Sequence, residues 1–522
     1  MSMLLFAYLA GCFLAAGVEV IDDAYISFRY AKHLIEGDGL VFNPGQAPVQ
    51  GYTNFLWTVL MALAMAVGCP PVTAAVGLGF AAGLVVTMLT ALWSERRLAP
   101  GLMAVAVAPA LLVSNLGFVV WSIRGLETGF FTALVLVAAW LAVRSGPSRP
   151  LPSTAAMIFA LSALTRPEGV LFFFLTVVHL GLCRWRSGGA PFRRADLRAL
   201  GLFSLVLGVY AIWTTLYYGD LLPNTFYAKV GGPLVSLPRG VRYLLKFARP
   251  RPVGLVNGTG LVLLVLPFAF LKRTRTDWTR SYAFLMVAGM SLYVAMVGGD
   301  VFPAYRFLVP ILPFFYLLVG DGIAALEERG RQRAAGGPAA VLPAAVVAGL
   351  LTCLVLQSFS ASSVFAWREW RRGNQYTSDM RMVGRWLKRH ERPGTWVAVN
   401  PSGALSYESE LPVIDMLGLN DAEIAHTPVQ SLGTGRLAGH EKGNGASVFR
   451  RRPEIILIGG VHLKGPLDSR PWGPHGRSER ELSRLPGLNR VYRLESAEMP
   501  DGRTLSFLRR RRKMESGEDD RP

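Results

Sequence analysis

Two adjacent carboxylates, Asp22 and Asp23, begin the polar run from Ile21 to Trp57, which separates two apolar segments. Two like charges at the mouth of a membrane helix are costly, because each opposes ionisation of the other and the bilayer solvates neither. A carboxylate there can take a proton from a hydroxyl group or bind a cation. A solvated acidic helix cap explains the pair equally well, so the pair alone does not decide between the two.

Later loops carry residues that could complete a site around the pair. Singly, these residues have ordinary explanations, since Glu127 and Glu168 would be favoured by helix N-terminal dipoles. Together they predict a polar cavity between helices at one membrane edge. Arginine can neutralise a phosphate bidentately, so this cavity suits transfer from an activated phosphate donor. The set comprises Arg29 in the first loop, Arg124 and Glu127 in WSIRGLETGFF, Arg166 and Glu168 in TRPEG, Asp220 and Asn224 in YYGDLLPNTFYAK, and Asp300 and Arg306 in GGDVFPAYRFLVP.

The composition is that of a multi-pass membrane protein. Of the 522 residues 52% are hydrophobic and 17% charged, with a mean hydropathy of +0.35. Much of the +19 net charge lies in short loops between apolar segments, where it indicates orientation and contact with membrane lipids and gives no support for a nucleic-acid partner. The 4 cysteines all lie in or beside apolar segments, which excludes a disulfide framework or thiolate zinc site in the polar C-terminal third.

Apolar runs long enough to approach a membrane crossing recur along the first 357 residues. The first of them lacks a basic leader and is interpreted as a retained span. The candidates are Met3–Val20, Thr53–Gly68, Val72–Trp93, Thr128–Val143, Ser153–Thr165, Gly169–Cys183, Ala199–Tyr217, Gly254–Leu271, Ser281–Gly298, Ala304–Gly320 and Ala339–Gln357.

The stretch Gly101–Arg124 decides the orientation of the N-terminal third. Three arginine-rich loops after it predict cytoplasmic segments, so the loops between them face outward. Counting back places Asp22 and Asp23 outside only if Gly101–Arg124 crosses as two short helices, as its break at Ser114 to Gly117 suggests. The basic outward loop Gly219–Val253 is interpreted either as a cradle for a lipid-linked phosphate or as an amphipathic helix on the lipid heads.

After residue 357 the chain is polar and lacks a spanning segment. We expect an amphipathic helix over Ser378–His390 and short buried strands that together form a small α/β domain outside the membrane. The expected strands are Thr395–Asn400, Pro412–Asp415, Ile455–Ile458 and Arg490–Leu494. The division is thus a transmembrane domain over 1–357 with a catalytic first outer loop over 21–52, a soluble domain over 358–508 and a disordered tail over 509–522.

The first-loop run DDAYISFRYAKHLIEGDGLVFNPGQAPVQGYTNFLW, followed by GLETGFF, TRPEG, GDLLPNTFYAK and GGDVFPAYRFLVP, resembles the GT-C superfamily of membrane glycosyltransferases. The likeness is greatest to the branch that includes the terminal β-(1→2)-arabinofuranosyltransferases and the flagellar motor control protein ZomB. The resemblance extends from the first loop to about the last span, and a weaker similarity is present in VIDMLGLNDAEIAH and GHEK. The resemblance implies a polytopic α-helical fold of about 11–13 membrane helices.

The resemblance also implies a polyprenyl-phosphate sugar as donor and a cell-envelope glycan or lipid as acceptor, with transfer on the outer face. Its catalytic acid maps onto Asp22 or Asp23, of which we prefer Asp23; either could hold a divalent cation, the one possible cofactor. It implies that Arg166 and Glu168 line the donor site and that Lys229 and Arg306 contact the phosphate. The residues expected on the acceptor side are Tyr52, Trp57, His440 and Glu441.

The function that the resemblance implies is transfer of a sugar, such as a pentofuranose, in the bacterial inner membrane, with the C-terminal domain periplasmic. A transporter or flippase of a lipid-linked substrate is the first alternative, because polar helix edges also suit substrate passage. A non-catalytic membrane support protein is the second. The acid pair discriminates between them, since only an enzyme requires it.

Overall fold

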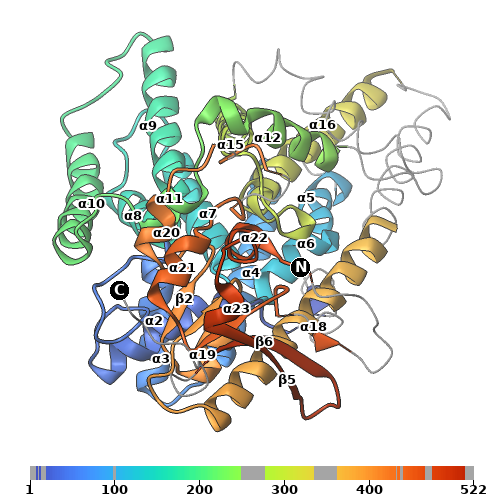
Figure 1. The fold of residues 1–522 in the computed structure, drawn as a ribbon. Helices are drawn as coiled ribbons and strands as arrows, with labels where there is room; N and C mark the ends of the chain where they lie inside the picture. The colour runs from blue at the N-terminus through green and yellow to red at the C-terminus, as the bar shows by residue number, and fades with distance from the viewer. Residues whose placement is uncertain are drawn as a thin grey trace.

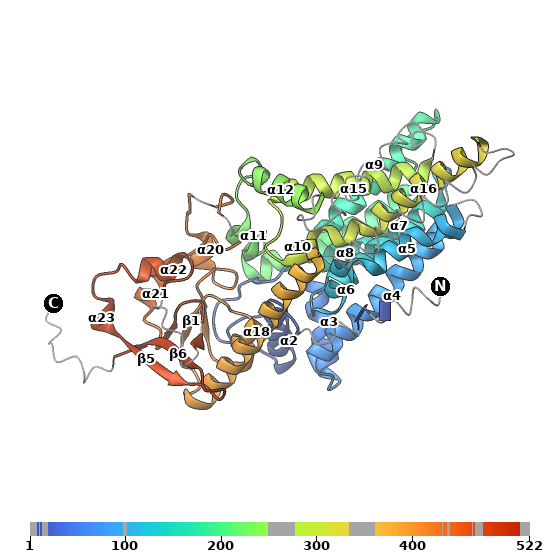
Figure 2. The ribbon, with the colours of Figure 1, turned by 90° about the vertical axis from the view of Figure 1, so that its right-hand side faces the viewer.

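The computed structural model describes residues 8–9, 11–12, 19–97, 102–248, 277–333, 361–430, 432–435, 439–461, 463–464 and 473–511. Its shape is elongated: apolar helices gather at one end, a mixed sheet lies at the other, and α2 and α18 lie between them (Figure 2). The described N-terminal residues lie with the apolar helices.

The apolar end is built from helices of the length that a bilayer requires. Six described helices are long and apolar enough to cross a membrane, and a bent pair would make a seventh. This agrees with a multi-pass membrane protein. The helices of this part are α3 (Phe55–Ala66), α4 (Pro71–Arg97), α5 (Leu102–Ser114), α6 (Leu116–Ile123), α7 (Thr128–Ser145), α8 (Ser153–Thr165), α9 (Glu168–Arg186), α10 (Asp196–Tyr218), α15 (Trp278–Val297), the 3-10 helix η1 (Pro303–Ile311) and α16 (Leu312–Arg333).

The predicted break in Gly101–Arg124 is confirmed. Helices α5 and α6 meet at an angle of 62° at Asn115. The Asn115 side chain accepts a hydrogen bond from the Phe118 backbone N–H, so it ends one helix and caps the next. Two short helices of 13 and 8 residues therefore replace one straight helix.

Several predicted spans have other outcomes. The stretches Thr53–Gly68 and Ser153–Thr165 form α3 and α8, which at 12 and 13 residues are short for a crossing. The predicted spans Gly254–Leu271 and Ala339–Gln357, and most of Met3–Val20, lie outside the described residues.

The first loop folds into helix α2 (Ala24–Glu36), which ends at Gly37 in the left-handed conformation. Its nine buried residues include Tyr25, Phe28 and Tyr30. The aromatic residues therefore pack inside the protein and do not form a belt at the membrane surface.

The predicted basic loop Gly219–Val253 contains α11 (Asn224–Lys229) and α12 (Pro233–Ala248). Helix α12 packs against α15 through Gly240, where a Cβ atom would lie 2.1 Å from the Ala295 carbonyl oxygen. Leu234 on the same helix is 83% exposed. An apolar exposed side on a basic helix favours the amphipathic interpretation of this segment over the phosphate cradle.

Helix α18 (Ala361–His390) connects the two ends of the molecule (Figure 2). It contains the predicted helix Ser378–His390 but begins 17 residues earlier. Its C-terminal half packs on α19 (Ala404–Ser409), which in turn packs on α2 (Figure 1). The first loop is thus enclosed between the apolar helices and the C-terminal domain.

The C-terminal domain has a six-stranded sheet in the order β2-β1-β3-β6-β4, with β5 also pairing with β6. The pairs β1–β2 and β1–β3 are parallel, and the pairs to β6 are antiparallel. Small helices cover the sheet: α20 (Ala422–His426), α21 (Gly445–Arg451), α22 (Gly476–Leu482) and α23 (Leu488–Val491). The strands are β1 (Val397–Val399), β2 (Val413–Asp415), β3 (Ile455–Leu457), β4 (Leu463–Lys464), β5 (Tyr492–Glu498) and β6 (Thr504–Arg510).

All four predicted strands are confirmed. The predicted tail boundary at residue 509 is wrong, because β6 continues to Arg510, and Arg509 pairs with Glu391 at 2.6 Å. The arginine-rich run there was misinterpreted, because Arg509 and Arg510 pair in register with Arg493 and Tyr492 of β5. Residues 512–522 lie outside the described residues.

Candidate active site

The two acids at the start of α2 have different environments. Asp22 is buried, and its Oδ1 accepts a hydrogen bond of 2.8 Å from the backbone N–H of Ala404, at the start of α19. Asp23 is half-buried, and no hydrogen bond or ion pair of its side chain occurs among the described residues. Asp22 therefore holds the C-terminal domain on the first loop, whereas Asp23 is available to a ligand.

Gly403 permits the close approach of the two parts at Asp22. A Cβ atom at Gly403 would lie 2.1 Å from the Asp22 carbonyl oxygen and 2.5 Å from its Oδ2. We expect Gly403→Ala to separate the two surfaces and lower the unfolding free energy by about 1–3 kcal/mol, the usual cost of overpacking. Thermal unfolding of the purified chain measures this. Gly473→Ala is the matched control, because no atom lies within 4 Å of a Cβ there; equal melting temperatures for the two variants would contradict the contact.

Burial, followed by the charge of Asp23, raises the pKa of Asp22 to about 7. An acid with a higher pKa in the folded chain folds more favourably when protonated, so its contribution to stability falls as pH rises from about 4 through 7. We expect Asp22→Asn to remove this penalty and raise the melting temperature at pH 8 by a few degrees, with a smaller effect at pH 5, where only part of the penalty is present. Melting curves of both proteins between pH 5 and 8 test it, and parallel curves would refute the assignment.

The backbone of Arg124 lies next to the start of the first loop, because its carbonyl oxygen accepts a 3.1 Å hydrogen bond from the backbone N–H of Ile21. Its side chain is 2% exposed, and burial lowers the pKa of the guanidinium to about 10. The side chain makes one hydrogen bond, from Nη1 to Oδ1 of Asn374 on α18 at 3.0 Å, and its buried Nε has no partner. No described carboxylate forms an ion pair with Arg124, although the charge of Glu19, which pairs with Arg381 at 2.7 Å, partly opposes the lowering of its pKa.

Tyr376, two residues after Asn374 on α18, lies near enough to the acid pair to be affected by its charges. It is 39% exposed, and its pKa is raised by burial of the hydroxyl and then by the charges of Asp22 and Asp23. Asp23, Arg124 and Tyr376 thus come from the first loop, the α6–α7 turn and the linker helix. This set combines a free carboxylate, an unpaired cation and a phenol, which is a combination suited to a phosphate and a sugar hydroxyl.

Arg29 has a different role from the predicted phosphate contact. Its guanidinium is buried and donates to the carbonyl oxygens of Phe42 and Leu411 at 2.7 and 2.8 Å, and also to that of Ser406. Because its donors are taken by the backbone of both parts, Arg29 joins the first loop to the C-terminal domain and does not fit a phosphate ligand.

Glu127, Arg166 and Glu168 form one buried cluster, as their shared loop edge predicted. Arg166 bonds to Glu127 at 3.1 Å through Nη1 and to Glu168 at 2.8 Å through Nη2. The other oxygen of Glu127 accepts from Asn54 at 3.0 Å. Two carboxylates already saturate the arginine, so a phosphate would have to displace one of them.

Asp300, Arg306 and Asn224 are likewise engaged within the protein. Arg306 pairs with Asp300 at 2.7 Å and lies over the ring of Phe302 at 4.6 Å. Asn224 donates to the carbonyl oxygens of Gly418 and Leu419 at 2.7 and 2.9 Å. The positions favour a structural use of these three residues.

Of the residues expected on the acceptor side, three are buried and one is exposed. Tyr52 is buried against the Tyr218 hydroxyl at 3.0 Å, and buried Trp57 donates to the Gly125 carbonyl oxygen at 3.2 Å, so neither lines an open surface. Glu441 is buried and pairs with Arg239 of α12 at 2.6 Å. His440 is exposed, as is Lys229, the predicted phosphate contact, whose aliphatic stem packs along Gly439.

Comparisons with known proteins find one matching domain family and several similar proteins. Residues 368–503 match the profile of a domain of unknown function, DUF8728. The chain is 29% identical over 365 residues to a terminal β-(1→2)-arabinofuranosyltransferase of Mycobacterium tuberculosis, covering 60% of this chain and 55% of that protein. It is 28% identical over 359 residues to the protein of that name from Corynebacterium glutamicum, covering 60% and 49%. The chain thus matches about half the length of these relatives.

Among solved structures, the chain is similar to ArnT from Cupriavidus metallidurans bound to undecaprenyl phosphate, with a TM-score of 0.58 at 10% identity over 97% of both chains. The chain has the GT-C fold. In this GT-C fold the acid pair begins the first loop, and the C-terminal domain covers that loop. The GT-C-like helical fold that the sequence resemblance implied is thereby confirmed.

Sequence reasoning missed the part of the GT-C site that the C-terminal domain supplies. Gly403 and Ala404 contact Asp22, and Asn374 contacts Arg124, although these residues lie some 250 to 380 positions away. No periodicity or motif signals such contacts. The one available hint was the polar Asn374 and Tyr376 in a helix that starts where the last apolar run ends. Among the described residues, no group of three His, Cys, Asp or Glu side chains could hold a metal ion.

Proposed function

We propose that the chain is a membrane glycosyltransferase that moves a sugar from a polyprenyl-phosphate donor to a cell-envelope glycan or lipid on the outer face of the membrane. The observation that carries the proposal is the pair Asp22–Asp23 at the start of the first loop of a GT-C fold, with Asp23 unpaired. The names of the two sequence relatives support a pentofuranose, arabinofuranose in particular, as the sugar.

The division of labour follows from the contacts of each group. Asp23 accepts the proton of the acceptor hydroxyl as its oxygen attacks the anomeric carbon, or it positions that hydroxyl through a bound cation. Arg124 holds the donor phosphate and compensates the charge that builds on it as the sugar departs. Tyr376 donates to either group. Asp22 keeps the C-terminal domain in place through its hydrogen bond to Ala404.

The placement of Arg124 supports it over the other cations as the phosphate ligand. Arg166 and Arg306 are each paired with carboxylates, Arg29 with backbone carbonyl oxygens, and Lys229 lies exposed beside Gly439. A buried cation without a direct ion-pair partner is costly, and an incoming phosphate would lower that cost. We infer that the acid pair faces the periplasm of a bacterial inner membrane, together with the C-terminal domain.

The test is reconstitution of the purified chain in vesicles with a synthetic polyprenyl-phosphate pentofuranose and a short arabinan acceptor. We expect transfer of the sugar and release of the free polyprenyl phosphate in equal amounts. A hexose donor of the same lipid is the comparison for sugar class. Movement of the intact donor across the bilayer without release of polyprenyl phosphate would instead identify a flippase.

A further inference from the structure

A cleft of about 290 Å³ opens at the far end of α2 from the acid pair, between α2, the last turns of α18 and the end of α19. Its volume lies near the lower end of the range of about 300–1,000 Å³ for small-molecule sites, so it holds a single small group and not a protein segment. The charged side chains that line it are Lys32, Arg385, Lys388, Arg389, Glu408 and Glu410.

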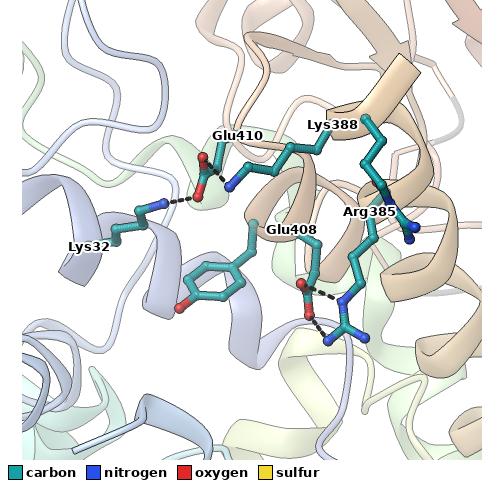
Figure 3. A pocket seen from close by; sticks show the side chains of 7 residues that line it. Lys32, Arg385, Lys388, Glu408 and Glu410 are labelled. Carbon is teal, nitrogen blue, oxygen red and sulfur yellow. Dashed lines mark hydrogen bonds and ion pairs between the residues drawn. The ribbon is translucent and has the colours of Figure 1, made fainter. Parts of the chain in front are cut away.

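Each carboxylate of the cleft is shared by two cations. Lys32 and Lys388 reach Glu410 from opposite sides, the latter at 2.6 Å, and Arg385 contacts Glu408 at 2.9 Å (Figure 3). Arg381 binds the same Glu408 at 2.8 Å. The four lining cations exceed the two lining carboxylates, and Lys32 also lies 3.8 Å from Glu36 on its own helix.

Arg389 adds a cation that no described carboxylate neutralises. Its Nε donates to the Arg385 carbonyl oxygen at 3.2 Å, and the side chain is otherwise exposed. Basic residues in the last turn of α18 are favoured by the helix dipole, which explains Lys388 and Arg389 in part. The dipole does not explain Lys32, which comes from another helix and points at the same carboxylate.

Glu410 is held in an uncommon backbone conformation. Its φ is 58°, in the left-handed region where glycine normally follows a helix, and it directly follows α19. Such a conformation at a non-glycine residue persists only where the surrounding contacts hold it. In this case it places the carboxylate between two lysines.

We propose that this cleft binds a phosphate or carboxylate group carried by the acceptor glycan, at a distance from the reacting sugar. Lys32 follows Asp23 by nine residues of α2, which is about 13 Å along a helix. Tyr407 lines the cleft and its ring contacts Tyr25 and Phe28, so the cleft and the start of the first loop share one packed surface. The assignment to the acceptor rests on the proposed function, whereas anion binding itself does not.

The experiment measures binding of tripolyphosphate and of trigalacturonic acid to the purified full-length chain in detergent, without donor. We expect the double variant Lys388→Gln/Arg389→Gln to bind on the order of tenfold more weakly. Glu410→Gln should bind more tightly, because it frees two lysines. The matched control is Arg480→Gln/Arg484→Gln, which removes the same charge from exposed positions on the C-terminal domain.

The relative affinity of the two probes identifies the source, since preference for tripolyphosphate indicates a phosphorylated acceptor and preference for trigalacturonic acid an acidic sugar. The inference is overturned if the wild-type chain binds neither probe, if the control variant loses as much affinity as the cleft variant, or if Glu410→Gln weakens binding. Because no donor is present, these results are independent of whether sugar transfer occurs. Transfer to an uncharged acceptor should be unchanged in the cleft variant.

Discussion

Asp23→Asn should reduce sugar transfer by roughly 10²- to 10⁴-fold, the usual contribution of a positioned proton acceptor. The amide has nearly the same shape but cannot accept the proton or bind a cation strongly. Asp23 makes no described side-chain contact, so its loss should leave the melting temperature almost unchanged. The measurement is release of polyprenyl phosphate at saturating donor, with the melting curve taken on the same preparation.

Two other acid-to-amide variants sharpen this test. Asp38→Asn changes an exposed carboxylate in the same loop and should be fully active. Asp22→Asn should retain most activity, because its oxygen can still accept the Ala404 N–H. The raised pKa of Asp22 would also suit a general base. An inactive Asp22→Asn variant together with an active Asp23→Asn variant would therefore show that Asp22, and not Asp23, is the catalytic acid.

Arg124→Gln should raise the donor KM by about 10- to 100-fold, the effect of losing one or more charge-assisted hydrogen bonds to phosphate. The variant should be as stable as the wild-type chain or more so, because the substitution removes a buried charge that no described carboxylate pairs with. A residue that merely supported the fold would show the opposite change in stability. Steady-state kinetics with varied donor and melting curves without donor measure the two effects.

A ligand-shift experiment separates phosphate binding from catalysis. Added polyprenyl phosphate should raise the melting temperature of the wild-type chain and of Lys229→Gln, but not that of Arg124→Gln. The Lys229 variant is the matched control, because that exposed lysine is the contact implied by sequence resemblance. If polyprenyl phosphate fails to raise the melting temperature of Lys229→Gln but raises that of Arg124→Gln, the phosphate binds at Lys229 of α11 and not at Arg124.

Most of the helices and strands, and the loops that carry the candidate site residues, could be predicted from the sequence alone. Hydropathy separated the apolar helices from the polar C-terminal third, and alternating or continuous apolar runs located β1, β2, β3 and β5. The break at Asn115 could be predicted because a cap residue and a glycine interrupt an apolar run. These features depend on neighbours along the chain, which is why composition and spacing reveal them.

The hydrogen-bond and ion-pair partners of each charged side chain became known only from the folded structure. Arg29 and Arg124 are both buried arginines near the acid pair, yet backbone carbonyl oxygens bind the first and a single asparagine binds the second. Asp22 and Asp23 are adjacent, yet only Asp22 meets the N-terminus of α19. The physical reason is that the free energy of a buried charge depends on its partners, and these partners come from segments hundreds of residues away that no local pattern can identify.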